Sequence, residues 1–481
     1  MDETASRLGE AWTPPVYDCS SAPTMVWKCT VPQHETVPYN FARNAKWCSD
    51  GSAVLFQCED RTFYIPEIPA RYCSSDTSPT QSTLTSARVF QQQSPILDYT
   101  WYPSASRNNP AAFCFVASVR ECPVKLLDAS DGRLRASYGI VDHRERQIAP
   151  HSIAFNATAD RFYCGFEDAI EVFDVQRPGE GTRLHTTPSK KSKDGLKGII
   201  SALAFSADAG SGVYAAGSLS PASSSSSNIA LFSEATGEAP IMFVGADSFS
   251  HGASPGIRSS VMQLMFNPTR PYLLYASFRR HESIYAWDLR GNASNPVYCF
   301  DRDAIPSSAA TTPSISPTIT NQKLRFDIDI TGSVLGLGDQ LGNVALFDAA
   351  PAGSDIDDLH LVSEACAARR LPKLKYTAHE DAIGSVSFHP LRPLLLSVSG
   401  SRHFDGSTSA TSNEASSSSS DSESGVEDNG EAKGDGSSNQ NVRVVRIRWR
   451  GPQPIAHDAS AKLWNFDSRV VGGRSTTGTA L

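Results

Sequence analysis

The sequence contains groups of basic side chains in short polar segments, and groups of this kind can bind phosphate. The pair Arg279-Arg280 is followed directly by His281, and a lysine cluster begins at Lys190. Lysine and arginine pair with phosphate oxygens, so clustered cations are what a phosphate-binding surface requires. Exposed loops also collect basic residues without any ligand, and this structural interpretation stays open. The candidate residues in these segments are Arg120, Lys190, Lys191, Lys193, Arg258, Arg279, Arg280 and His281.

A second basic element, residues 443–450, has the sequence RVVRIRWR. In a strand, strict alternation would place Arg446 and Arg448 on one face and Ile447 and Trp449 on the other. Three interpretations are compatible with the pattern. The strand could contact RNA, it could be neutralised by the acidic segment that precedes it, or it could be an edge strand whose charge prevents aggregation.

The composition excludes a protein that coats nucleic acid through bulk charge, because the 481 residues carry a formal net charge of −8. A local basic site is compatible with this charge. No segment reaches the ~18 apolar residues that a membrane span requires, and the first residues lack the apolar core of a signal peptide. The ten cysteines form no Cys-x-x-Cys pair, so we expect reduced, packed thiols in an intracellular protein.

The sequence lacks the motifs of common enzymes, metal sites and cofactor sites. It has no Gly-x-Ser-x-Gly, no His-Glu-x-x-His and no phosphate-binding loop. The glycines at positions 336, 338 and 342 resemble a dinucleotide-binding loop only loosely and open no helix. We therefore expect a binding protein rather than an enzyme, with no catalytic residue, no metal and no cofactor.

The segments that would position the cations recur regularly along the chain. Seven apolar runs end in an aromatic residue, and successive aromatic residues are about 50–60 positions apart. Short strand-like runs between turn residues, repeated at this spacing, are typical of propeller blades. The seven aromatic anchors are Trp47, Trp101, Phe155, Phe205, Phe266, Phe326 and Phe388.

Most repeats also end in a second mark, an aromatic residue or leucine directly before a polar residue. The marks are Leu127-Asp128, Phe173-Asp174, Phe232-Ser233, Trp287-Asp288, Phe347-Asp348 and, in the last repeat, Trp464-Asn465. This degenerate Trp-Asp ending predicts an all-β protein, a seven-bladed WD-repeat β-propeller. In such a fold, the loops between blades share one face with the loops between the second and third strands of each blade. The clustered cations fall in loops of these two kinds.

The propeller is expected to span residues 23–470, with flexible tails at 1–22 and 471–481. A Ser-rich acidic segment, 403–441, interrupts the last blade and is expected to be disordered because it cannot bury a core. The run Thr24 to Val31 is expected to supply the outer strand of the seventh blade, since a ring closed from both chain ends leaves no free sheet edge. We expect a monomer.

Six phrases occur along the chain in this order: FARNAKWCSDGS, DYTWYPS, ASVRECPVKLLDASDGRLRASY, PHSIAFNATADRFYCGFEDAIEVFDVQRPG, KGIISALAFS and ESIYAWDLR. These phrases and their order resemble the WD-repeat family of the telomerase Cajal body protein, in a fungal-type form. The resemblance runs from about Asn40 to Trp464 and includes the acidic interruption of the last blade.

The resemblance implies a non-enzymatic, RNA-binding adaptor of the nucleus. Its ligands would be small Cajal-body RNAs, with telomerase RNA as a further target, and it would direct the assembly and localisation of their ribonucleoproteins. The implied location is the Cajal body or an equivalent nuclear body, with the cytoplasm as a second compartment, and the other partners would be ribonucleoprotein proteins. A distant yeast relative is linked to pre-mRNA splicing, so a protein scaffold in splicing-complex assembly is the alternative function.

Overall fold

A computed structural model of the protein describes residues 13–33, 37, 39–72, 87–189, 191–192, 194–220, 227–245, 259–302, 320–349, 367–404 and 454–467. The chain divides into a larger unit, Met1–Ser401 with Ala456–Leu481, and a smaller unit, Arg402–Ile455. In the described part of the smaller unit, His403 and Ile455 pair through two backbone hydrogen bonds of 2.9 and 2.8 Å. Most of the predicted acidic insert and both predicted tails beyond residues 13–22 lie outside the described residues.

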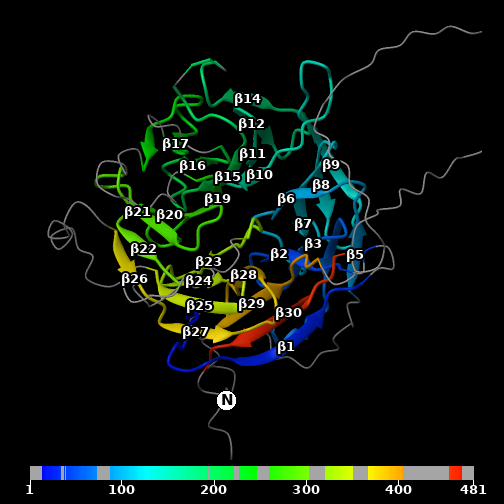
Figure 1. The fold of residues 1–481 in the computed structure, drawn as a ribbon. Coiled ribbons are helices and arrows are strands. Elements are labelled where there is room, and N and C mark those ends of the chain that lie inside the picture. Colours follow the sequence, from blue (N-terminus) through cyan, green and yellow to red (C-terminus); the bar gives the residue numbers. More distant parts are fainter. Residues whose placement is uncertain are drawn as a thin grey trace, which may run out of the picture. The chain divides into compact units, whose positions relative to one another are not determined.

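The larger unit contains seven sheets, and four antiparallel strands of each sheet form one blade. Figure 1 shows the blades following one another around a centre. Blade one is β2 (Ala42–Trp47), β3 (Val54–Cys58), β4 (Thr62–Ile65) and β5 (Arg88–Gln91). Blade two is β6 (Ile96–Trp101), β7 (Cys114–Val119), β8 (Val124–Asp128) and β9 (Leu134–Gly139). Blade three is β10 (Ser152–Phe155), β11 (Arg161–Phe166), β12 (Ala169–Asp174) and β14 (Thr182–His185). Blade four is β15 (Ile200–Phe205), β16 (Val213–Ser218), β17 (Ile229–Ser233) and β18 (Met242–Val244).

The remaining three blades follow the same plan. Blade five is β19 (Val261–Phe266), β20 (Leu273–Phe278), β21 (Ile284–Asp288) and β22 (Tyr298–Phe300). Blade six is β23 (Asp327–Ile328), β24 (Val334–Gly338), β25 (Asn343–Asp348) and β27 (Leu374–Thr377). Blade seven is β28 (Ile383–Phe388), β29 (Leu394–Ser399), β30 (Ser460–Asn465) and β1 (Thr24–Thr30). The predicted all-β, seven-bladed propeller is confirmed.

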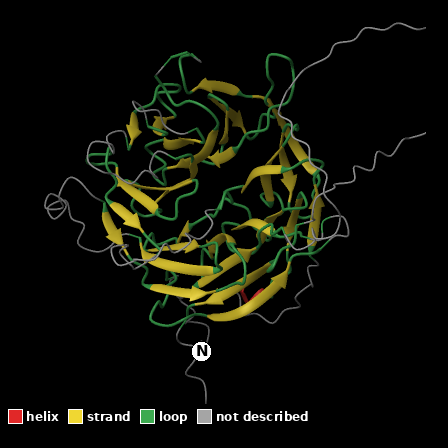
Figure 2. Cartoon of the chain, viewed as in Figure 1, coloured by secondary structure: helices red, strands yellow, loops and turns green. Residues whose placement is uncertain are grey.

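Three short elements lie outside this plan. Strand β13 (Gly179–Glu180) adds in parallel to β9, and β26 (Ala368–Arg370) adds in parallel to β22. The only helical element of the described residues is the 3₁₀ turn Ala70–Tyr72, drawn in red in Figure 2. The described part of the chain thus holds no helix with the length and apolar character needed to cross a membrane.

The aromatic anchors end the innermost strands in six of the seven blades, and blade six is the exception. In the other blades, the residue after the anchor donates its backbone N–H across the turn to the next strand, as Asn267 does to Leu273 O at 3.0 Å. In blade six this bond comes from Asp329, so the equivalent anchor is Ile328 and not Phe326. Because side chains alternate along a strand, Phe326 still faces the core, two residues earlier, with 2% of its surface exposed. The second marks all end third strands, as predicted.

Blade seven is closed by both ends of the described chain. Strand β1 pairs antiparallel with β30 from Thr24–Asn465 to Thr30–Ser460, which confirms the predicted closure. Inside this blade, His379 Nε2 lies 2.7 Å from Ser397 Oγ, which accepts from Trp464 Nε1 at 2.9 Å. His379 Nδ1 lies 3.1 Å from an Asp458 oxygen. Burial lowers the pKa of His379. Because Ser397 precedes the insert and Asp458 and Trp464 follow it, these contacts link the strands on either side of the insert.

The innermost strands are linked in a ring by side chains that bond the backbone of the next blade. All seven blade junctions have such a link between described residues. The links run from Lys46 Nζ to Tyr99 O (2.5 Å), Ile153 N to Asp98 (2.9 Å), Ser152 Oγ to Ile200 O (2.8 Å), Ser201 Oγ to Val261 O (2.6 Å), Gln263 Nε2 to Phe326 O (2.8 Å), Phe388 N to Asp327 (2.8 Å) and Ala45 N to Ser385 Oγ (2.9 Å).

Trp287 and Phe347, the marks of blades five and six, fill the gaps between neighbouring blades. Trp287 is fully buried and packs in one cluster with Ala215 and Leu231 of blade four. Phe347 is 1% exposed and meets Phe300 of blade five edge-on, with ring centroids 5.7 Å apart. Both burials agree with the predicted blade register.

We predict that Trp287→Ala lowers the free energy of unfolding by ~3–5 kcal/mol and yields insoluble protein, because it leaves a cavity between two blades. The indole N–H of Trp287 has no hydrogen-bond partner among the described residues, so Trp287→Phe should cost less than Trp464→Phe, which also deprives Ser397 of its donor. Expression yield and thermal melting check both comparisons. A soluble Trp287→Ala protein with an unchanged melting temperature would contradict the register.

Candidate nucleic-acid interface

Hydrogen bonds tie the loop between the second and third strands of a blade to the segment that precedes its first strand. Arg120 N donates to Pro95 O at 3.0 Å in blade two, and Arg279 N donates to Ser260 O at 2.8 Å in blade five. Gly400 N donates to Ala382 O at 2.9 Å in blade seven. We call the face formed by these loops the upper face. Arg161 starts the second strand of blade three and therefore lies at the opposite face.

The structure describes half of the predicted phosphate-binding residues and places them on the upper face. Arg120, Lys191, Arg279 and Arg280 are exposed there, and His281 is half-buried. Arg120 and Lys191 come from blade two and from the connection between blades three and four. Lys190, Lys193, Arg258, Arg446 and Arg448 lie outside the described residues, so their role stays a prediction.

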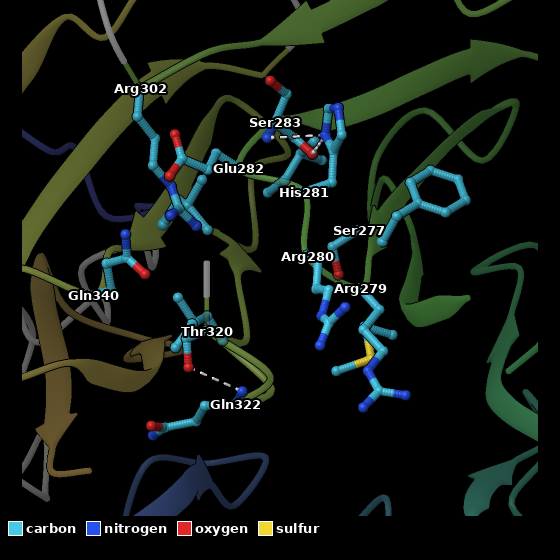
Figure 3. A pocket seen from close by; sticks show the side chains of 15 residues that line it. Ser277, Arg279, Arg280, His281, Glu282, Ser283, Arg302, Thr320, Gln322 and Gln340 are labelled. Atoms are coloured by element: carbon cyan, nitrogen blue, oxygen red, sulfur yellow. Dashed lines mark hydrogen bonds between the residues drawn. The ribbon is translucent and has the colours of Figure 1, made fainter. Parts of the chain in front are cut away.

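Arg279 and Arg280 converge on one side chain at the edge of a shallow upper-face pocket of about 40 Å³. Arg280 Nε donates to Asn321 Oδ1 at 2.8 Å, and Arg279 Nη2 approaches the same oxygen at 3.3 Å. Figure 3 shows the two guanidinium groups extending in the same direction from their loop. Two exposed cations held by one neutral amide keep their full positive charge, which suits them to pair with an anion.

The loop that carries these arginines is held in a strained turn. Arg280 has φ of 57°, in the left-handed region that favours glycine, and Glu121 and Asp168 adopt φ of 61° and 57° in the equivalent loops of blades two and three. A non-glycine residue in this region costs about 1 kcal/mol or more. The side chain at position 280 is therefore kept in the sequence at some cost in backbone free energy.

His281 stabilises the loop and does not add a cation to it. Its Nδ1 accepts the backbone N–H of Ser283 at 3.3 Å, a contact drawn in Figure 3, and its Nε2 lies 3.4 Å from the Tyr285 hydroxyl. Burial lowers the pKa of His281, so the ring is neutral at pH 7. This places His281 in a positioning role beside Arg279 and Arg280.

Segment 320–326, which leads into blade six, joins the arginine pocket to the centre of the propeller. Gln322 and Leu324 line the pocket, whereas Arg325 lines a cavity of about 400 Å³ between the innermost strands. The segment is fixed to blade seven, because Gln322 Nε2 donates to Gly400 O at 2.9 Å and Arg325 N donates to Gly384 O at 2.9 Å. Thus residues of one short segment line two neighbouring hollows.

The central cavity contains charged residues that sequence reasoning missed. Lys46 Nζ and Arg325 Nη2 lie 4.0 and 3.4 Å from the same oxygen of Asp98. Burial raises the pKa of Asp327 to about 7 and lowers the pKa of Lys46 to about 8. The signal was present, since these charges fall one or three residues before an anchor position, where alternation points side chains to the centre. These charges stand singly inside apolar runs, whereas the predicted site residues come from clusters of basic residues.

Comparisons with known proteins identify relatives over most of this chain, although no family model matches it. Telomerase Cajal body protein 1 of Rattus norvegicus is 28% identical over 371 residues, which are 77% of this chain and 61% of the relative. The Telomerase Cajal body protein 1 homolog of Drosophila melanogaster is 22% identical over 380 residues, 77% of this chain and 58% of the relative. The resemblance to the telomerase Cajal body protein family is confirmed.

A further relative, matched over a shorter part of the chain, has a different name. Guanine nucleotide-binding protein negative regulator 1 of Schizosaccharomyces pombe is 26% identical over 147 residues, 30% of this chain and 37% of the relative. The chain spans about three fifths of the rat relative of the telomerase Cajal body protein family.

We predict a pH-dependent stability that is due to Asp327. Its folded pKa is raised by burial to about 7, so between about pH 4 and pH 7 the folded state holds its proton more tightly than the unfolded state, and the free energy of unfolding falls as pH rises. Asp327→Asn keeps an acceptor for Phe388 N but cannot ionise. Its melting temperature should therefore fall less over this range, by the equivalent of on the order of 3 kcal/mol. Equal pH profiles of the two proteins would contradict a buried, protonated carboxyl.

Proposed function

We propose that this protein is a non-enzymatic, RNA-binding adaptor of the nucleus that binds small Cajal-body RNAs and directs the assembly and localisation of their ribonucleoproteins. The observation that carries the proposal is the pair Arg279 and Arg280, two exposed cations that converge on Asn321 on the upper face. The names of the animal relatives, which refer to telomerase and to the Cajal body, support the cellular setting. Telomerase RNA is the further ligand in this proposal, and ribonucleoprotein proteins are its other partners.

In the proposed RNA recognition, some side chains would contact the phosphate backbone and others would contact the bases. Arg279, Arg280 and Lys191 would neutralise phosphates, while polar groups such as Gln322 and Gln340 in the same pocket would meet the bases of an unpaired loop. Sequence-specific RNA recognition usually targets unpaired bases that can be splayed out, with phosphate contacts fixing the register. The net charge of −8 limits binding to this local surface and opposes non-specific coating.

The alternative function is a protein scaffold, for example in splicing-complex assembly, whose upper face would hold peptides. Crosslinking in cells followed by RNA sequencing separates the two functions. We expect enrichment of small nuclear RNAs with the wild-type protein. The absence of any enriched small RNA would reject the RNA adaptor and favour the scaffold.

We predict that reversing charge at Lys191, Arg279 and Arg280 together weakens RNA binding without unfolding the protein, because all three side chains are exposed. Each lost phosphate contact should reduce the slope of log affinity against log salt by about 0.7, the value for single strands. Arg161→Glu on the opposite face, which also replaces an exposed arginine, is the matched control. An equal loss of affinity per reversed charge in both proteins would indicate bulk charge instead of a site.

A single substitution separates folding from binding even more clearly. In Arg280→Gly, glycine adopts the positive φ of 57° without strain, so the melting temperature should stay equal or rise. RNA affinity should fall and the salt slope should decrease by about 0.7. A drop in both stability and affinity would mean that Arg280 serves the fold and not the ligand.

A further inference from the structure

Charged side chains gather at the centre of the propeller, where Lys46, Asp98, Arg325 and Asp327 line the cavity. Lys46 and Arg325 share one oxygen of Asp98, and the other oxygen accepts Ile153 N at 2.9 Å. Asp98 therefore contacts two cations and one backbone N–H group. We call Lys46, Asp98 and Arg325, which line the cavity, together with the neighbouring Lys323 and His151 the channel mouth.

Lys323 is the cation of the channel mouth for which the described residues provide no ion-pair partner. Its ammonium group forms no hydrogen bond or ion pair with any described residue. Burial and then the positive charge of Arg325 lower its pKa to about 8, so it is still protonated at pH 7. Lys323 and Arg120 both also lower the pKa of His151, after burial, which shows that their charges reach the same point from blades six and two.

A neutral donor lies unused in the same cavity. Asn44 is 3% exposed and lines the cavity, and its side-chain Nδ2 has no acceptor among the described residues. A buried N–H group without an acceptor costs free energy. An oxygen-rich anion would satisfy the amide of Asn44 and pair with the ammonium group of Lys323.

Segment 320–326 connects this mouth to the arginine pocket. Asn321 contacts Arg279 and Arg280, and Lys323, only two residues later, is close enough to Lys46 and Arg325 for their charges to lower its pKa. A chain with regularly spaced phosphates that binds at the pocket would have its next contact at the mouth. This continuity favours an RNA strand over an isolated anion or a singly phosphorylated peptide.

We propose that the channel mouth binds a backbone phosphate of single-stranded RNA, with Lys323 as the cationic contact and the Asn44 amide as a hydrogen-bond donor. The proposal rests on the RNA-binding function proposed above and extends its site from the upper face into the central channel. The bound phosphate would give Lys323 the ion-pair partner that it lacks among the described residues, since Asp98 contacts Lys46 and Arg325.

The test measures binding of a fluorescein-labelled oligouridine to the full chain by anisotropy across a salt series. Lys323→Gln should lower affinity about fivefold and reduce the salt slope by about 0.7, because one phosphate contact is lost. Lys28→Gln, the same change on the exposed outer strand of blade seven, should leave both unchanged. Asn44→Asp, an isosteric change that adds a negative charge, should also weaken binding, and its melting temperature shows whether it folds.

The outcomes distinguish this inference from the proposed function. If the oligouridine binds and the triple variant at Lys191, Arg279 and Arg280 binds less, but Lys323→Gln matches Lys28→Gln, only the channel inference is overturned. If the wild-type protein binds no RNA, the proposed function fails as well. A Lys323-dependent affinity for a phosphoserine peptide, with oligouridine binding unaffected, would overturn RNA as the occupant of the mouth.

Discussion

The propeller depends on hydrogen bonds that join each innermost strand to the next around the ring. At every one of the seven junctions described, a side chain of one inner strand bonds the backbone of its neighbour. Inner strands converge at the centre, where their facing backbone groups have no adjacent sheet to satisfy them, and an unpaired buried group is costly. Side chains one or three residues before the anchor, or four in the case of Ser201, supply the missing partners.

This requirement explains why the centre is polar and charged. Longer side chains such as Lys46, Gln263 and Asp327 line the cavity together with short serines. Longer side chains bring charge with them, and Asp98 then serves two purposes, bonding Ile153 N and pairing with Lys46 and Arg325. The scaffold thus places charged side chains at the centre as a by-product of closing the ring, and Lys323 lies close enough to add positive charge there.

The outer parts of the blades pack against one another through apolar side chains, and the loops above them take no part in this packing. Between blades the gaps are filled by aromatic residues such as Trp287 and Phe347, which bury large areas without polar partners. The tight loops above them need left-handed residues, and Arg280 occupies such a position where glycine would fit with less strain. Stability therefore comes from the packed faces, and the chemistry of the upper face can vary without affecting them.

The sequence by itself determined the number of blades, the ends of the third strands and the closure by Thr24 to Val31, because these depend on local period-two patterning and on aromatic residues that must be buried. It failed in blade six, where the aliphatic Ile328 takes the anchor position and the aromatic Phe326 sits one pleat earlier. The exposed cations of the upper face were also predictable, since loops with Lys and Arg can be read directly from the chain.

Only the tertiary structure decided which of these charges meet. Lys46, Asp98 and Arg325 are distant in sequence and come together because inner strands of blades one, two and six face a common centre. His281 shows the converse, since it lies beside two arginines in sequence and yet is neutral, because folding buries its ring against Tyr285. Periodic patterns report which face of a strand is buried, but convergence of strands and the desolvation that sets charge arise only once the ring is closed.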